Sequence, residues 1–158
     1  MTRRCVPLDQ SATAAATLLR RITAQLDQRA ADFAAAEGLH PTDLRALVLL
    51  LDARRDGHPA TPGWLSARLS LNSASITALV DRLARGGYVE RTPDRRDRRR
   101  VLLALRDRGL AVGTAYLSAT AGVVTAALSG FDAEDMGTAV RVLSSLDQAL
   151  SGAPSVRA

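Results

Sequence analysis

The feature of this chain that most constrains its fold is a switch of hydrophobic period within residues 72–105. The first part has apolar residues at the three- and four-residue spacing of a one-sided helix, namely Ile76, Leu79, Val80 and Leu83. A Gly-Gly pair at 86–87 ends this helix, and two short apolar segments, 88–91 and 101–105, then flank a charged loop. A loop of this size is consistent with a two-stranded wing.

Helical patterns continue on both sides of this region. Before it, we expect helices over residues 9–37, 41–55 and 61–69, and after it a long helix over 107–128 and a last helix that Asp132 caps. Aromatic residues make up only 3% of the chain, so its core must be built from Leu, Val and Ala, which suits packed helices. The predicted fold class is mainly α with a small two- or three-stranded β wing: a winged helix-turn-helix with long terminal helices.

Positive charge is concentrated in the loop of the hairpin. The net charge is +5, and residues 91–100 alone hold six Arg and two Asp. Arginines at a hairpin tip can enter a minor groove, where narrow A·T tracts deepen the negative potential. The residues that we expect to contact double-stranded DNA are Arg95, Arg96, Arg98 and Arg99. We interpret Asp97 as a strut that fixes the loop by pairing with Arg99. A charge run is otherwise usually a solvated face, but this one lies where a wing must lie.

The outward face of the helix at 72–85 suits the major groove, where base pairs present distinct donors and acceptors. Its residues are small or polar, and those predicted to face the groove are Ser73, Ala74, Ser75, Thr77, Ala78 and Arg82. Small side chains let the helix approach base edges closely, and Arg82 is placed for a phosphate or a guanine. The alternative is an ordinary amphipathic helix with a solvated face. The capped helix before it and the hairpin after it favour DNA binding.

Other classes of site have little support in the sequence. Cys5 is the only cysteine, so no internal disulfide is possible, and with His40 and His58 it makes no metal-ligand spacing. No catalytic triad or phosphate loop is recognisable, and we expect neither enzymatic activity, nor a metal, nor a cofactor. We interpret Cys5 as an inert terminal thiol, although arginines precede it. The first ten residues lead into no apolar stretch, so we expect no membrane partner and a cytoplasmic, nucleoid-associated protein.

A family resemblance covers roughly residues 39–110. The run TPGWLSARLSLNSASITALVDRLARGGYVER, followed by TPDRRDRRRVLLALRDRG, resembles the MarR (multiple antibiotic resistance regulator) family. The resemblance implies a homodimeric transcriptional regulator, usually a repressor, on a near-palindromic operator; many members release DNA when a small anionic or phenolic effector or an oxidant acts. By position, it implies groove-facing Ser73, Ser75 and Thr77, and wing residues Arg96 and Arg99. Trp64 departs from the family's usual Glu, and His40 from a common capping Thr.

The terminal helices are predicted to form a dimer. Residues 1–38 and 107–158 are the expected dimerisation segments, and 39–106 the DNA-binding segment. Ala111–Leu128 contains no charged residue, so it must be covered all round, and a partner subunit is the natural cover. The last helix has an apolar stripe that we expect to be buried, formed by Met136, Val140, Leu143, Leu146 and Leu150. Two alternatives stay open: a helix threaded through a monomer core, and a winged-helix module that binds protein instead of DNA.

Overall fold

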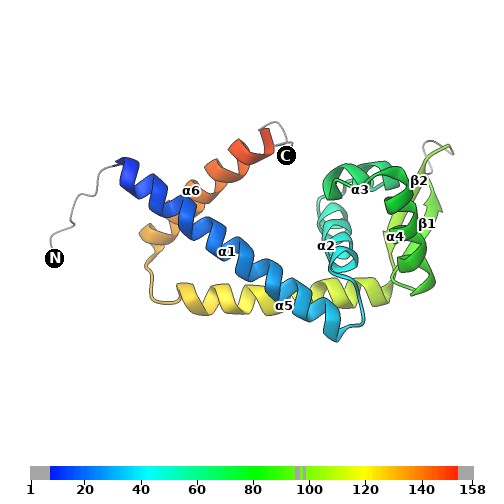
Figure 1. Ribbon diagram of the computed structural model, residues 1–158, viewed down its shortest axis with the longest axis horizontal. Coiled ribbons are helices and arrows are strands. Elements are labelled where there is room, and N and C mark those ends of the chain that lie inside the picture. Colours follow the sequence, from blue (N-terminus) through cyan, green and yellow to red (C-terminus); the bar gives the residue numbers. More distant parts are fainter. Residues whose placement is uncertain (1–7, 95–96, 98, 153–158) are drawn as a thin grey trace. The chain divides into compact units, whose positions relative to one another are not determined.

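The computed structural model describes residues 8–94, 97 and 99–152. Its elements are α1 (Leu8–Ala36), α2 (Pro41–Arg55), α3 (Pro62–Leu69), α4 (Ser73–Arg85), β1 (Val89–Pro93), β2 (Val101–Leu105), α5 (Asp107–Leu128) and α6 (Ala133–Gly152) (Figure 1). The mainly α winged-helix class is thereby confirmed, and only β1 differs noticeably from its expected bounds of 88–91. The chain forms two compact units, one up to Ser118 and the other from Ala119 onward.

The core of the first unit lies among α2, α3 and α4, and the hairpin β1–β2 lies beside α4 (Figure 1). The largest side chains sealed within it are Leu44, Leu47, Leu65, Val80, Leu83 and Val89. The expected inward face of α4 is confirmed, because Ile76, Leu79, Val80 and Leu83 are all buried. Burial of this one face directs the opposite face of α4 to solvent.

Side-chain caps set where the helices of this unit begin. His40 caps α2: its Nδ1 accepts a hydrogen bond from the Thr42 N–H at 3.2 Å, and Asp43 accepts one from the His40 N–H at 3.3 Å. The substitution of His for a capping Thr therefore preserves a reciprocal cap. Thr61 caps α3 by accepting from the Trp64 N–H at 3.1 Å, as its position before Pro62 predicts.

Trp64 is half-buried and packs against the core of the first unit. Its ring lies 5.4 Å from the His58 ring, and the Arg68 guanidinium lies 5.5 Å from the centre of the Trp64 ring. Trp64 therefore stabilises the contact between α3 and the turn after α2.

The wing is a two-stranded antiparallel sheet in which Val89 pairs with Leu105 and Pro93 with Val101. The sequence pattern allowed for a third strand. At that place the structure has one backbone hydrogen bond, from the Leu103 N–H to the Ala60 carbonyl at 2.8 Å. That bond ties the hairpin to the segment before α3.

The first turn of α5 packs tightly against the end of α4. A Cβ atom on Gly109 would collide with the Tyr88 carbonyl oxygen, so only glycine fits this position. The Arg108 guanidinium lies 4.4 Å from the centre of the Tyr88 ring and donates to the Gly86 carbonyl at 3.0 Å. These contacts fix the direction in which α5 leaves the winged-helix core.

In the single chain, the α6 stripe that we expect to be buried is largely exposed. Val140, Leu143 and Leu150 are each more than half exposed. On α1, Leu18 and Ile22 are exposed to a similar degree. The sequence pattern identifies a face that needs apolar cover, but each unit lacks a further layer to supply that cover.

Among the described residues, α5 is the one helix long and apolar enough to cross a membrane. Length and composition alone are weak evidence, because a helix that packs against protein has the same composition. Gly109, Val112 and Gly113 of its first half are buried in the winged-helix unit. This half of α5 is therefore part of a folded protein core.

Candidate nucleic-acid interface

The outward face of α4 carries the predicted groove-facing residues. Asn72 caps the helix by accepting a hydrogen bond from the Ser75 N–H at 2.9 Å. The residues of this face that are exposed as expected are Ser73, Ala74, Ser75, Thr77 and Ala78. This surface, which we call the reading face, combines small side chains with a position opposite the buried stripe, so a flat partner can approach the helix backbone closely.

The hydroxyl group of Thr77 is turned toward its own helix. Thr77 Oγ1 donates to the Ser73 carbonyl, one turn earlier, at 2.8 Å. This back-bond occupies the proton that would otherwise be available to a base or a phosphate. The hydroxyl oxygen can still accept a hydrogen bond, but it has no proton to donate, and the methyl group of Thr77 remains available to a partner.

Arg82 is held against α2 by a buried carboxylate. Its Nε and Nη2 donate to the two oxygens of Asp43 at 2.9 and 2.6 Å, and the Asp43 side chain is only 2% exposed. The hydrogen bond to Asp43 raises the pKa of the Arg82 guanidinium above its usual value, so the residue stays charged at any working pH. Arg82 thus anchors α4 to α2 through one edge of its guanidinium. The sequence-based prediction of Arg82 as a DNA contact did not include this ion pair.

No sequence pattern indicated the role of Asp43. Its carboxylate both completes the cap of α2 and holds Arg82, which lies 39 positions later. A carboxylate in the first helical turn signals a cap, but no local pattern reveals a partner so distant in sequence.

A second ion pair joins α4 to the wing. Arg91 Nη2 on β1 lies 2.6 Å from Asp81 Oδ1 on α4, and both side chains are partly exposed. The pair neutralises the carboxylate on the outer side of α4, which would otherwise repel a phosphate. It also links the hairpin to the helix that carries the reading face.

The hairpin loop is closed by hydrogen bonds around Asp97. Its carboxylate accepts from the Arg99 N–H at 3.0 Å, and its carbonyl accepts from the Arg100 N–H at 2.9 Å. Asp97 therefore organises the loop as expected of a strut, but through the backbone of Arg99 and not through the guanidinium that we had expected. In an extended chain, the side chains of Asp97 and Arg99 would lie on the same side. In the turn, the backbone N–H of Arg99 points to the Asp97 carboxylate instead.

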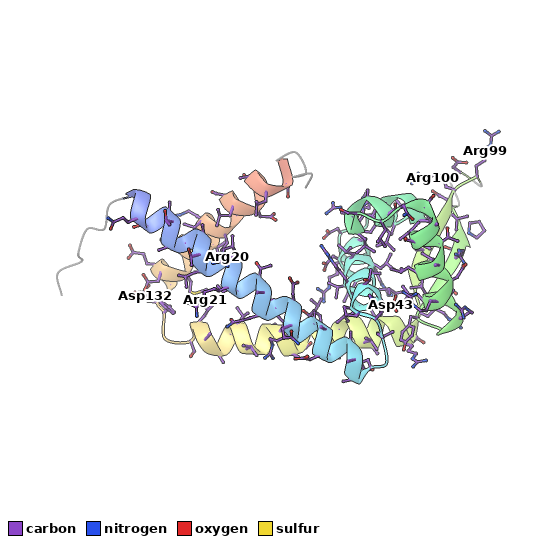
Figure 2. All side chains as sticks on the ribbon, viewed as in Figure 1. Arg20, Arg21, Asp43, Arg99, Arg100 and Asp132 are labelled. Carbon is purple, nitrogen blue, oxygen red and sulfur yellow. The ribbon has the colours of Figure 1, made fainter. Side chains whose placement is uncertain are left out.

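Exposed guanidinium groups lie at the tip of the wing. Figure 2 shows Arg99 and Arg100 at the far end of the hairpin, away from Asp43. Arg100 Nη1 lies 3.7 Å from Asp94 Oδ2, and both Arg99 and Arg100 are exposed. Arg95, Arg96 and Arg98, which we also expect to contact DNA, lie outside the described residues, as does Cys5.

A cavity of about 470 Å³ lies in the first unit between α1, α2, the end of α3 and Tyr116 of α5. Its lining includes Arg45 and Thr42 of α2, Asp27 of α1 and Tyr116 of α5. The volume is within the range of small-molecule sites. In the described part of the chain, no three His, Cys, Asp or Glu residues are grouped in a way that could hold a metal ion.

Comparisons with known proteins agree with this architecture. A family model described as "MarR family" matches residues 37–100. The chain is 31% identical over 117 residues to the HTH-type transcriptional repressor YetL of Bacillus subtilis, covering 74% of this chain and 69% of that protein. A solved MarR family protein from Bacillus stearothermophilus superposes with a TM-score of 0.75 at 26% identity, covering 92% of this chain and 99% of the other.

A second relative matches over a shorter length at higher identity. The HTH-type transcriptional regulator YcgE of Bacillus subtilis is 47% identical over 70 residues, which cover 44% of this chain and 43% of that protein. The chain thus spans less than half of YcgE and somewhat more than two thirds of YetL. Both relatives are named as regulators of transcription, in agreement with the expectation that this chain is not an enzyme.

Proposed function

The chain belongs to the MarR family, and from this premise we propose that it is a sequence-specific DNA-binding repressor that acts as a homodimer on a near-palindromic operator. The observation that carries the proposal is the surface formed by α4 and the wing. The exposed reading face and the arginines of the hairpin tip belong to elements that the Asp81–Arg91 pair joins. A helix fits the major groove and an arginine-rich hairpin fits the neighbouring minor groove.

The homodimer part of the proposal rests on uncovered apolar side chains. Leu18 and Ile22 on α1 and Val140 and Leu143 on α6 are each about half exposed or more. Burial of such side chains contributes about 25 cal/mol per Å² of apolar surface, which makes a second copy of the chain a stable cover. A twofold dimer places two reading faces about 34 Å apart, one turn of B-DNA, which accounts for a near-palindromic site. Residues 1–38 and 107–158 would serve this dimerisation.

Repression and its relief form the finer part of the proposal. The relative YetL is named a repressor, and a dimer seated on an operator blocks access to the DNA it covers. The 470 Å³ cavity beside Arg45 is our candidate site for a small anionic or phenolic effector. It lies next to α2, which holds Arg82 of α4 through Asp43, so a ligand there has a mechanical route to the reading face. The protein would work in the cytoplasm, at the nucleoid.

The test is a salt titration of DNA binding. The purified protein is titrated against the intergenic DNA upstream of its own coding region and against a shuffled duplex, at several salt concentrations. Specific, salt-sensitive binding supports the proposal. In a dimer, Arg99→Ala should lower the slope of log K against log salt by about 0.9 for each lost phosphate contact.

Arg20→Ala is the matched control, because it removes the same charge from α1 and not from the wing (Figure 2). It should leave the salt slope unchanged. If Arg99→Ala and Arg20→Ala behave alike, the wing is not part of the interface. If the protein binds no duplex even at low salt, a module that binds protein becomes the better account.

A further inference from the structure

The reading face of α4 offers methyl groups at its centre. The Thr77 hydroxyl donates to the Ser73 carbonyl at 2.8 Å, so its methyl group remains for a partner. Ala74 lies about one turn before Thr77 and Ala78 directly follows it; both are exposed, and each side chain is a methyl group. Three methyl groups thus stand on the part of the helix that we place in the major groove.

Two of the three charged residues of the same helix, Asp81 and Arg82, are engaged elsewhere, and the third, Arg85, is exposed at the C-terminal end of the helix. Arg82 directs its Nε and Nη2 to Asp43, and Asp81 pairs with Arg91 of the wing at 2.6 Å. Arginine is the side chain that most often reads guanine, and a carboxylate is one that reads cytosine. With these two side chains engaged, the exposed groups at the centre of the helix are the methyl groups of Ala74, Thr77 and Ala78 and the hydroxyl of Ser75, so methyl contact is a principal means of recognition there.

From these contacts we infer that α4 recognises thymine through its 5-methyl group, and that Thr77 is a specificity-determining residue for this recognition. The 5-methyl of thymine projects into the major groove, where Ala and Thr methyl groups contact it favourably. Each operator half-site should therefore carry at least two thymines at the positions that face Ala74, Thr77 and Ala78. The inference rests on the proposed DNA-binding function and specifies which bases that function reads.

The experiment begins by selecting preferred sequences from a library of random 30-base-pair duplexes with the full-length protein. In the selected duplex, each thymine is then replaced singly by deoxyuridine, which removes the 5-methyl group and leaves the base pairing and the minor groove unchanged. Burial of one methyl group corresponds to about a fourfold change in affinity. We expect about a fourfold loss at two or more thymines in each half-site.

Two variants with opposite chemistry assign the effect to Thr77. Thr77→Ser keeps the hydroxyl and its bond to Ser73 but removes the methyl group, and it should lose the distinction between thymine and uracil at one position. Thr77→Val keeps the methyl group but removes the hydroxyl, and it should retain that distinction. Circular dichroism verifies that both variants are folded.

The outcomes separate this inference from the proposed function. If the selection yields a preferred sequence but no thymine is sensitive to loss of its methyl group, the inference is wrong while the DNA-binding function stands. If Thr77→Ser distinguishes thymine from uracil as well as the wild type does, the assignment to Thr77 is wrong. If the selection yields no preferred sequence, the proposed function fails and the inference falls with it.

Discussion

Replacing Arg82 by Met should destabilise the protein far more than its position on the helix surface suggests. The Asp43 side chain is 2% exposed and accepts two hydrogen bonds from Arg82, at 2.6 and 2.9 Å. Without the guanidinium, a buried carboxylate keeps only the His40 N–H, at 3.3 Å. Breaking a buried pair from one side costs about 3–5 kcal/mol. Because the Arg82 side chain is itself 48% exposed, water can reach the vacated position, and we expect a loss of about 3 kcal/mol.

A double-mutant cycle separates this loss from an effect of the substitution alone. Asp43→Asn combined with Arg82→Met removes the buried charge, so the double variant should be more stable than Arg82→Met by about 1–2 kcal/mol. Arg85→Met is the matched control, since Arg85 is an exposed arginine on the same helix, and it should change the free energy of unfolding by less than about 0.5 kcal/mol.

The assay is urea unfolding followed by circular dichroism at one fixed protein concentration, because the proposed dimerisation would make the apparent stability depend on concentration. The reasoning is refuted if Arg82→Met costs no more than Arg85→Met. It is equally refuted if adding Asp43→Asn to Arg82→Met brings no recovery, because the cost would then not arise from an unpaired buried carboxylate.

Three further substitutions test other parts of the structure. Gly109→Ala places a Cβ against the Tyr88 carbonyl and should lower the free energy of unfolding, measured by thermal unfolding, by about 2–3 kcal/mol. Gly122→Ala, in open space on the same helix, should stabilise the protein by up to about 1 kcal/mol. Equal effects of the two substitutions would contradict the close approach of Gly109 to Tyr88. Ser70→Gly relieves a left-handed φ of 53° and should raise the free energy of unfolding by about 1 kcal/mol, and a loss of stability would contradict this. Leu143→Asp, at an exposed apolar position, should shift sedimentation equilibrium toward monomer, and an unchanged dimer would exclude α6 from the interface.

Local signals in the sequence were sufficient to predict the helices and the hairpin. Asn72 before a one-sided apolar stripe and the Gly-Gly pair after it define α4, because caps and helical period act within a few residues. The hairpin follows from two apolar segments of similar length on either side of a charged loop. The exposure of Ser73, Ser75 and Thr77 follows from the same period.

Partners distant in sequence were not predictable from these signals. The sequence predicts Arg82 as a DNA contact because Arg82 lies at the edge of the outward face of α4. In the structure it pairs with Asp43 of another helix. Asp97 reads as a partner of the Arg99 side chain, yet the turn presents the Arg99 amide. The cover for the apolar stripe of α6 is also undefined, because hydrophobic period identifies a face and not the surface that covers it.

The central claim is that α4 and the wing occupy adjacent grooves of one DNA duplex, and affinity cleavage tests it most directly. An iron chelate is attached to Ala78→Cys or to Arg99→Cys in a Cys5→Ala background, and strand cleavage is mapped on a selected duplex. The account predicts a major-groove cleavage pattern from position 78 and a minor-groove pattern from position 99, about half a helical turn apart and repeated about the centre of the site. Cleavage from both positions in the same groove, or diffuse cleavage from position 99, would contradict it.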